Sequence, residues 1–437
     1  MSFVEAIAEK RDGGSLSRDE IAAFVRGASD GSLPVEQLAS MLMAICCRGM
    51  DVDETRWLTE EMLNSGELWD IASVRPEVVD KHSTGGIGDT VSLVLAPLLV
   101  SVGVPVAMMA GRGLGHSQGT LDKLDAVPGW DSTRDRDETL RLVDSCGAAI
   151  IAQTEDIAPA DRTLYALRDV TGTVPSLPLI VGSIMSKKLA LGAGALILDV
   201  KWGTGAFRKT KASARELAVA LRQVALDTGV RCEALITDMN QPLGPALGTA
   251  CEVREALAVL SGGGDDLLRE ATLGLCREAM VLRGWKAEEA ATALADALAD
   301  GSALAAWERI TVAHGGDPDP GMLAQSRASI EVTARKSGFV TSCDGEDLGR
   351  VAAEAGAGRR RVDEALAHGA GILVHARIGD WVEAGQPVAT LLLGAREVDQ
   401  ERLTGSIREA FEIGPDRVEP PELILGTPED INESLER

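Results

Sequence analysis

The sequence lacks three features, and each absence excludes a class of protein. It contains no Cys-x-x-Cys pair, and its seven cysteines are scattered, which argues against a disulfide framework and a structural zinc site. The longest apolar stretches, such as 91–100, contain Ser or Pro and are too short to span a bilayer. Glu5, Glu9 and Arg11 interrupt the opening segment, so it does not resemble a secretion signal. We therefore expect a cytoplasmic protein that does not interact with membranes.

Positive charge is also scarce. Lys and Arg number 43 against 67 Asp and Glu, which gives a formal net charge of −24. This charge disfavours nonspecific binding to nucleic acid, whose phosphates attract cationic surfaces. It also repels small anions at long range, so a phosphate site in this chain must be a local cluster of cations and backbone N–H groups.

Two kinds of periodicity divide the 437 residues. Helical patterns fill the chain to about residue 65, where Ser17 to Glu20 forms a capping box and further helices are predicted near 34–49 and 53–64. From about residue 77, short apolar runs alternate with helical stretches, which is typical of an α/β fold with a mostly parallel sheet. The predicted strands are 78–81, 104–110, 148–153, 195–201 and 232–239. The predicted helices are 160–170, 178–191, 212–227, 249–260 and much of 265–314.

The pattern changes again near residue 326. Short strands and turns predict a β-rich C-terminal region, and 372–391 resembles the sandwich of biotinyl carrier domains. That segment contains no lysine that could carry a cofactor, so we expect a structural role for it. From about residue 416 the chain is polar and contains proline, and we expect a mobile tail there.

The first segment with chemical character is 80–92. Three glycines within 85–88 follow a predicted strand and precede a predicted helix, so bare N–H groups can approach a ligand. Lys81 adds a full cation, and Ser83 and Ser92 add hydroxyl donors. These groups predict an anion cradle, for which phosphate is the natural occupant. The alternative is a tight strand-to-helix turn with incidental polar residues.

A second glycine-rich loop, 111–119, also follows a predicted strand. Both loops should therefore open at the same sheet edge, where α/β proteins bind ligands. Thr120, near a predicted helix start, is suited to donate its hydroxyl to the same anion. His116 fits either a structural role in the loop or a direct role in the site.

A third group lies on two predicted helices. Ser183 and Lys187 are four residues apart and share a helix face, and Arg168 can reach the same space from the preceding helix. One guanidinium, one hydroxyl and one ammonium match a planar ligand edge that carries carbonyl oxygens and a ring N–H. Tyr165, the single tyrosine, could line that pocket or pack in the core. Each charged residue has a plain alternative as a solvated helix charge.

These motifs, taken together, resemble the pyrimidine-nucleoside phosphorylase family, which includes thymidine phosphorylase. The likeness extends over nearly the whole chain. The segments that carry it are 81–86, 111–116, 120–124, 158–161, 165–169, 183–188, 199–201, 203–207 and 237–239.

The resemblance implies a homodimer whose small helical domain is hinged to a larger α/β domain. The implied boundaries are 1–66 and 158–192 for the helical domain, 67–157 and 193–326 for the α/β domain, and 327–437 for the β-rich C-terminal domain. The implied activity is reversible phosphorolysis of a pyrimidine nucleoside, most simply thymidine, deoxyuridine or uridine. The products are free base and a sugar 1-phosphate. Inorganic phosphate is a co-substrate, and no cofactor is required.

The resemblance also assigns residues. Phosphate would contact Lys81, Ser83, Ser92 and Thr120, and the base would contact Arg168, Ser183, Lys187, Leu114 and Tyr165. We expect Arg168 and Lys187 to stabilise the departing base, and His82 to donate a proton or hydrogen bond to it. A structural cation is implied at Gly88, Thr90, Leu243, Ala246 and Glu255.

Three positions depart from the family pattern, namely Ala110, where a phosphate-binding Ser is usual, Gln118 and Trp202. They leave open a catalytically altered or silent nucleoside-binding relative. A phosphoribosyltransferase of the same broad fold is the other alternative, although it would need diphosphate and Mg²⁺ chemistry.

Overall fold

The computed structural model describes residues 2–113, 118–359 and 364–431, and it divides into two compact units. The helical unit comprises Met1–Val78, Gln153–Gly194 and Val219–Arg231. The sheet unit comprises Val79–Ala152, Ala195–Ala218 and Cys232–Arg437. Among the described helices, none has both the length and the apolar character that a membrane span needs.

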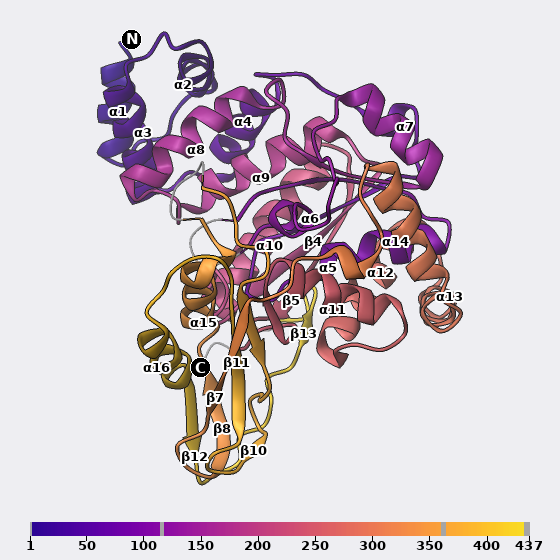
Figure 1. Cartoon of the computed structure of the whole chain (residues 1–437). Helices are drawn as coiled ribbons and strands as arrows, with labels where there is room; N and C mark the ends of the chain where they lie inside the picture. Colours follow the sequence, from indigo (N-terminus) through magenta and orange to yellow (C-terminus); the bar gives the residue numbers. More distant parts are fainter. Residues whose placement is uncertain (1, 114–117, 360–363, 432–437) are drawn as a thin grey trace. The chain divides into compact units, whose positions relative to one another are not determined.

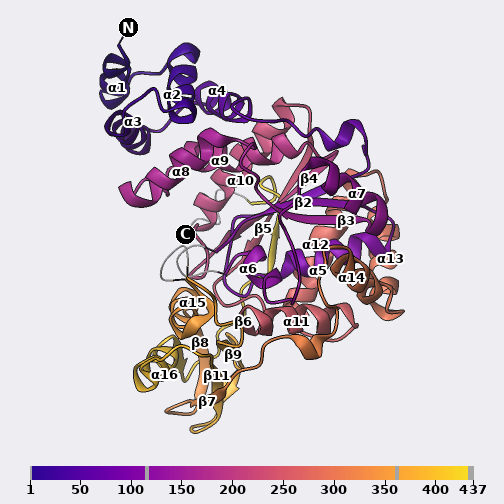
Figure 2. The same ribbon diagram turned by 45° about the horizontal axis from the view of Figure 1, so that its top comes forward.

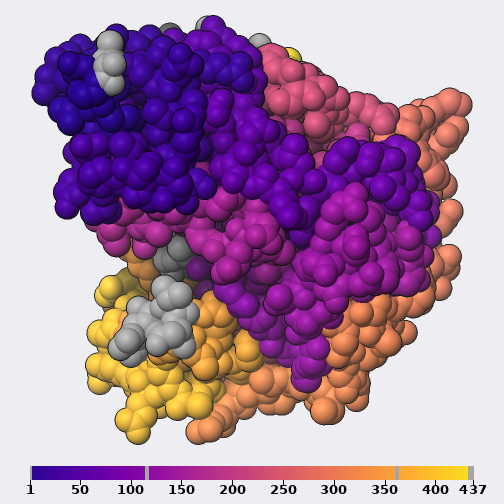
Figure 3. Space-filling model, turned by 90° about the horizontal axis from the view of Figure 1, so that it is seen from above, coloured from indigo at the N-terminus to yellow at the C-terminus, as the bar shows by residue number. Residues whose placement is uncertain are grey.

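The helical unit begins with four helices whose starts are encoded locally. Ser17 and Glu20 form the predicted capping box, and Asp51 and Glu54 form another at the start of α4. In the interior of the unit, the Nζ of Lys10 donates to Oε1 of Glu54 at 2.7 Å. The four helices are α1 (Phe3–Arg11), α2 (Arg18–Asp30), α3 (Val35–Arg48) and α4 (Val52–Leu63). In Figure 3 their indigo atoms form one closely packed body.

The chain returns to this bundle after residue 153. Helices α8 (Pro159–Thr171) and α9 (Leu177–Leu191) pack against the first four, α8 on α2 and α3, and α9 on α4. Gly182 permits the close approach of α9 to α4, because a Cβ there would lie 3.3 Å from the sulfur of Met62. The unit also contains a short 3-10 helix, Ile71–Ser73, and the end of α10 (Lys211–Asp227).

The sheet unit is built on a six-stranded sheet in the order β13-β5-β4-β1-β2-β3. The first five strands in the chain are β1 (Val79–Ser83), β2 (Val106–Ala110), β3 (Ala148–Ala152), β4 (Ala195–Trp202) and β5 (Arg231–Asp238). β1 pairs in parallel with β4 and β2, and β2 pairs in parallel with β3. The predicted α/β fold with a mostly parallel sheet is confirmed, since buried parallel strands require the near-continuous apolar runs seen in the sequence.

Helices cover this sheet. α5 packs on β2 and β3, α7 on β3 and α12 on β4, as Figure 2 shows around the central strands. The helices of this part are α5 (Val91–Ser101), α6 (Thr120–Leu124), α7 (Arg136–Cys146), α11 (Ala250–Leu260), α12 (Asp266–Leu282), α13 (Ala287–Ala299) and α14 (Ser302–Ala313).

The prediction of a mobile tail from residue 416 is wrong for part of that segment. Ile424–Gly426 forms β13, which pairs antiparallel with β5, and Asp238 donates its N–H to the carbonyl of Leu423 at 2.8 Å. Without β13, the outer N–H and C=O groups of β5 would lie at an open sheet edge. The last residues, 432–437, lie outside the described ranges.

The C-terminal region contains two smaller sheets, which Figure 1 shows at the yellow end of the chain. Their orders are β6-β9-β11-β7 and β10-β8-β12. Since β6 precedes α11 in the sequence, the first small sheet joins the C-terminal region to the α/β part. The strands are β6 (Ala246–Gly248), β7 (Ala328–Thr333), β8 (Gly338–Cys343), β9 (Gly371–Val374), β10 (Trp381–Val382), β11 (Pro387–Leu393) and β12 (Phe411–Gly414). The helical segments are Pro320–Met322, α15 (Gly345–Ala352), Ala353–Ala357 and α16 (Gln400–Glu409).

Candidate active site

The first glycine-rich loop connects β1 to α5, as predicted. Lys81 is buried on β1, and its Nζ donates to Ser92 Oγ on α5 at 3.2 Å. Two of the predicted phosphate residues therefore lie together. His82 follows Lys81 on the strand, so its side chain leaves the opposite face of the sheet.

Ser83 has a partner that the sequence did not suggest. Its Oγ donates to Asp89 Oδ2 at 2.5 Å and accepts the N–H of Gly85 at 3.2 Å. The other oxygen of Asp89 accepts the N–H of Val91, the first residue of α5, at 3.3 Å. A carboxylate therefore already engages donors that were expected to bind phosphate.

Lysines surround this carboxylate. Burial alone would raise the pKa of Asp89, but the ammonium groups of Lys201, Lys81 and Lys123 lower it far below its ordinary value. Lys201 lies 2.8 Å from Asp199, which also lies 3.4 Å from Lys81. The cradle is thus a local cationic cluster inside an acidic protein, and the lysines are held by buried carboxylates.

Helix α6 ties the second glycine-rich loop to the first. Lys123 donates to the carbonyl of Asp89 at 2.5 Å and lies 2.6 Å from Glu252. Thr120, at the first position of α6, is half-buried. Leu114 and His116 lie outside the described residues.

All three departures from the family pattern are among the described residues. Ala110 ends β2 and carries no hydroxyl. Gln118 is buried, and its Nε2 finds no hydrogen-bond partner within the described ranges. Trp202 ends β4, with the ammonium of Lys211 5.0 Å from its ring centroid.

The predicted base-binding residues lie on α8 and α9 of the helical unit. Lys187 donates to Ser183 Oγ at 3.0 Å, which confirms that the two side chains share a face. Lys187 also pairs with Asp161 on α8 through a short contact. The other oxygen of Asp161, Oδ1, is buried without a hydrogen-bond partner among the described residues.

Arg168 is buried and held by main-chain carbonyls. It donates to Leu179 O at 2.9 Å and to Val174 O at 2.7 Å, and its guanidinium carbon lies 5.5 Å from the ring centroid of Tyr165. Burial lowers the pKa of Arg168, and the nearby charge of Asp161 opposes that shift. Burial also raises the pKa of Tyr165.

Asp161 therefore lies within electrostatic range of both predicted base-binding cations. It was not singled out from the sequence. The available signal was its spacing of seven residues from Arg168, which places both on one face of α8.

The residues that the resemblance implies for a structural cation are only partly suited to hold one. Glu255 is buried, its Oε2 accepts the N–H of Ala246 at 3.2 Å, and its Oε1 has no partner in the described chain. Burial, followed by the charge of Glu252, raises the pKa of Glu255 to about 8. A bound cation would give Oε1 a partner and would stabilise the ionised form of Glu255.

The other members of that set already have contacts. The carbonyl of Gly88 accepts the N–H of Gly244 at 3.1 Å, and Arg377 donates to the carbonyl of Leu243 at 3.1 Å. Thr90 donates to Glu252 at 3.0 Å. Across the described ranges, no group of three or more His, Cys, Asp and Glu side chains could hold a metal, so a cation here would depend on main-chain oxygens.

Comparison with known families places three matches along the chain. Residues 4–66 match the helical bundle domain of a glycosyl transferase family, and residues 75–304 match the α/β domain of that family. Residues 339–414 match the pyrimidine nucleoside phosphorylase C-terminal domain.

Individual relatives agree with these matches over nearly their full length. The pyrimidine-nucleoside phosphorylase of Bacillus subtilis is 43% identical over 406 residues, which cover 92% of this chain and 94% of that protein. The Geobacillus stearothermophilus protein of the same name is 42% identical over 416 residues, covering 93% and 96%.

Among solved structures, the anthranilate phosphoribosyltransferase of Thermus thermophilus matches with a TM-score of 0.55 at 18% identity. The match covers 71% of this chain and 99% of that one. At this identity the likeness shows a shared fold alone.

Proposed function

The chain belongs to the pyrimidine-nucleoside phosphorylase family of pentosyltransferases, and we propose which of its residues carry out the reaction. The activity is transfer of the pentosyl group of a pyrimidine nucleoside to inorganic phosphate, giving free base and a sugar 1-phosphate. The observation that carries this conclusion is 42–43% identity over more than nine-tenths of the chain to phosphorylases of this name.

Phosphate is held by Lys81, Ser83, Ser92 and Thr120. The Lys81–Ser92 contact of 3.2 Å and the link from α6 to the first loop support this set. The hydroxyl of Ser83 donates to Asp89 in this structure. To bind phosphate, it gives up that hydrogen bond and donates to a phosphate oxygen instead. The amide nitrogen of Gln118, which has no hydrogen-bond partner among the described residues, adds a donor in the second loop, whereas Ala110 at the end of β2 offers no side-chain donor.

The base is held by Arg168, Ser183 and Lys187, with Tyr165 beside Arg168. As the C1′–N1 bond of the nucleoside breaks, its electron pair moves to the base and a phosphate oxygen bonds to C1′. Arg168 and Lys187 stabilise the resulting negative charge. His82 donates a proton or hydrogen bond to the departing base.

The proposed phosphate residues lie in the sheet unit and the proposed base residues lie in the helical unit. Holding both substrates in line is the main source of acceleration in this scheme. The chain requires no cofactor, and a structural cation would be held by Glu255 with main-chain oxygens of Gly88, Leu243 and Ala246. The seven free thiols suit a reducing cytoplasm. A homodimer remains a prediction.

The test is base release from thymidine, deoxyuridine, uridine and cytidine, each with and without phosphate. Release that depends on phosphate, with formation of the sugar 1-phosphate, is the expected result, and the ranking identifies the preferred base and sugar. The expected substrate that reacts fastest is thymidine, deoxyuridine or uridine. Nucleoside binding without release at high phosphate would instead identify a silent relative.

A further inference from the structure

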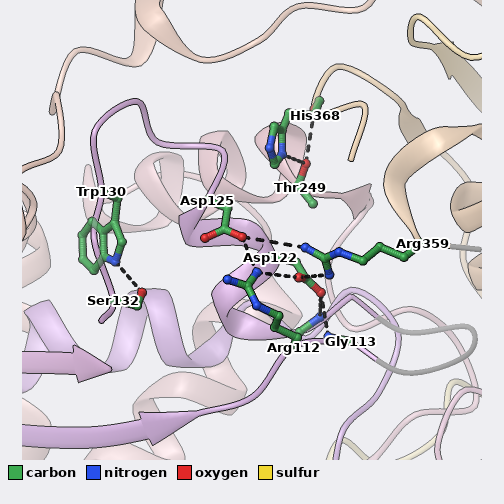
Figure 4. A network of polar contacts seen from close by, with 10 residues as sticks. Arg112, Gly113, Asp122, Asp125, Trp130, Ser132, Thr249, Arg359 and His368 are labelled. Atoms are coloured by element: carbon green, nitrogen blue, oxygen red, sulfur yellow. Dashed lines mark hydrogen bonds and ion pairs between the residues drawn. The ribbon is translucent and has the colours of Figure 1, made fainter. Parts of the chain in front are cut away.

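Four charged side chains form a compact network beside the second glycine-rich loop (Figure 4). Asp122 and Asp125 lie in and just after α6, Arg112 lies in the loop itself, and Arg359 comes from the C-terminal region. All four belong to the sheet unit. Arg359 and Asp122 are 237 positions apart in the sequence, so the network joins two regions that only folding brings together.

Asp122 is the centre of the network. Its Oδ2 accepts the N–H groups of Gly113 at 2.6 Å and Gly119 at 3.1 Å, one at each side of the loop segment 114–118. Its Oδ1 accepts from Arg359 at 2.5 Å and from Arg112 at 3.4 Å. One buried carboxylate therefore holds the main chain at Gly113 and Gly119, and a guanidinium from another region holds the carboxylate.

Asp125 reinforces the arrangement. It pairs with Arg112 through a short contact and lies 3.8 Å from Arg359. Figure 4 shows the two guanidinium groups approaching the pair of carboxylates from different directions. Two carboxylates thus balance two guanidinium groups, and the planar fork of arginine suits this shared geometry better than a lysine ammonium does.

We propose that Arg359 is a positioning residue for phosphate binding, acting through Asp122 on the main chain at Gly113 and Gly119 and thereby on Thr120. This inference rests on the proposed function of Thr120. Thr120 directly follows Gly119, whose N–H is bound by Asp122, and Lys123 of the same helix contacts the first loop. A displacement of Asp122 therefore moves the junction of both loops.

The physical basis is the cost of burying Asp122. Its side chain is 4% exposed, whereas that of Arg359 is 19% exposed. Removal of the guanidinium leaves a buried carboxylate with less compensation, so it shifts toward Arg112 or solvent. Either movement weakens its bonds to the N–H groups of Gly113 and Gly119, and the second of these directly precedes Thr120.

The experiment measures steady-state kinetics of Arg359→Ala and Arg359→Lys with phosphate and nucleoside varied separately. The expected result for Arg359→Ala is a phosphate KM roughly 5- to 20-fold above that of the unaltered protein, because a charge-assisted bond is lost. The KM for the nucleoside should stay within about twofold, and Arg359→Lys should lie between. Arg350→Ala is the matched control, since Arg350 makes exposed contacts with Glu346 and Asp347 on α15.

A purely structural role predicts a different pattern. The two KM values would then change together or not at all, and either result would overturn the proposal. Arg359→Lys keeps the charge, so it remains informative if Arg359→Ala does not fold.

Phosphate binding gives a readout that does not need turnover. Phosphate should raise the Tm of the unaltered protein, and Arg359→Ala should need roughly 5- to 20-fold more phosphate for the same shift. If the unaltered protein binds phosphate but releases no base, the proposed function is contradicted. The phosphate dependence of Tm in the unaltered protein and in Arg359→Ala can still be compared in that case. Equal phosphate dependence in Arg359→Ala and Arg350→Ala would overturn the positioning role.

Discussion

Asp161 offers the sharpest test of the proposed base site. It is buried on α8, pairs with Lys187 and acts electrostatically on Arg168, so it should orient both cations toward the base. We expect Asp161→Asn to lower kcat/KM for the nucleoside while leaving the phosphate KM within about twofold. The substitution keeps the shape of the side chain and removes its charge.

The size of the effect follows from the contact. A hydrogen bond between charged groups contributes about 1.5–3 kcal/mol, and the Lys187 side chain is 24% exposed, so water replaces part of the lost interaction. The lower half of that range, about 1.5–2.3 kcal/mol, corresponds to roughly a 10- to 45-fold loss in kcat/KM. Initial rates at low nucleoside and saturating phosphate would measure it.

Asp169→Asn is the matched control, because Asp169 lies exposed on the same helix. It should change kcat/KM by less than about twofold. Asp161 also lies in the first turn of α8, where a carboxylate stabilises a helix, so Tm must be measured as well. A lower Tm with unchanged kcat/KM far below the transition would refute the orienting role and leave only a structural one.

Four further outcomes are expected. Burial lowers the pKa of His314 to about 4, so the unfolded chain binds the proton more tightly than the folded chain does. The free energy of unfolding should therefore fall by about 3 kcal/mol as the pH drops from about 6.5 to 4. A His314→Gln variant should show a smaller fall in denaturant titrations. K⁺ or Ca²⁺ should raise the Tm of the unaltered protein more than that of Glu255→Gln, and equal shifts would exclude Glu255 as a ligand. Gln118→Ala should raise the phosphate KM by roughly 3- to 10-fold with the nucleoside KM unchanged, and a null result would remove Gln118 from the phosphate site. Removal of residues 422–437 should lower the free energy of unfolding by about 1–2 kcal/mol, which corresponds to a fall in Tm of about 1–2 °C, and should promote association through the β5 edge. An unchanged Tm in calorimetry would contradict the role of β13.

The acidic composition and the use of phosphate are compatible in this structure. The net charge of −24 is a property of the whole chain, whereas Lys81, Lys123 and Lys201 gather at one buried place. Carboxylates such as Asp199 and Glu252 hold these ammonium groups in the interior. Local pairing therefore determines the electrostatics of the cradle more than the total charge does.

Features written into short segments were predictable. The capping box at Ser17 and Glu20, the strands β1 to β5 and the shared face of Ser183 and Lys187 all follow from spacings of a few residues. Local periodicity determines such elements, because helices repeat every 3.6 residues and strands every two. The family motifs were equally readable, since glycine-rich loops need specific residues at fixed positions.

The sequence by itself thus determined the fold class, the two loops and the family. Tertiary structure decided the partners of the charged residues: Asp89 for Ser83, Asp161 for Lys187, and Arg359 for Asp122. It also decided that the segment around Ile424 completes the main sheet. In the sequence, a carboxylate that will be buried beside a partner cannot be told from one that will face solvent. Only long-range folding determines which charged groups lose their contact with water.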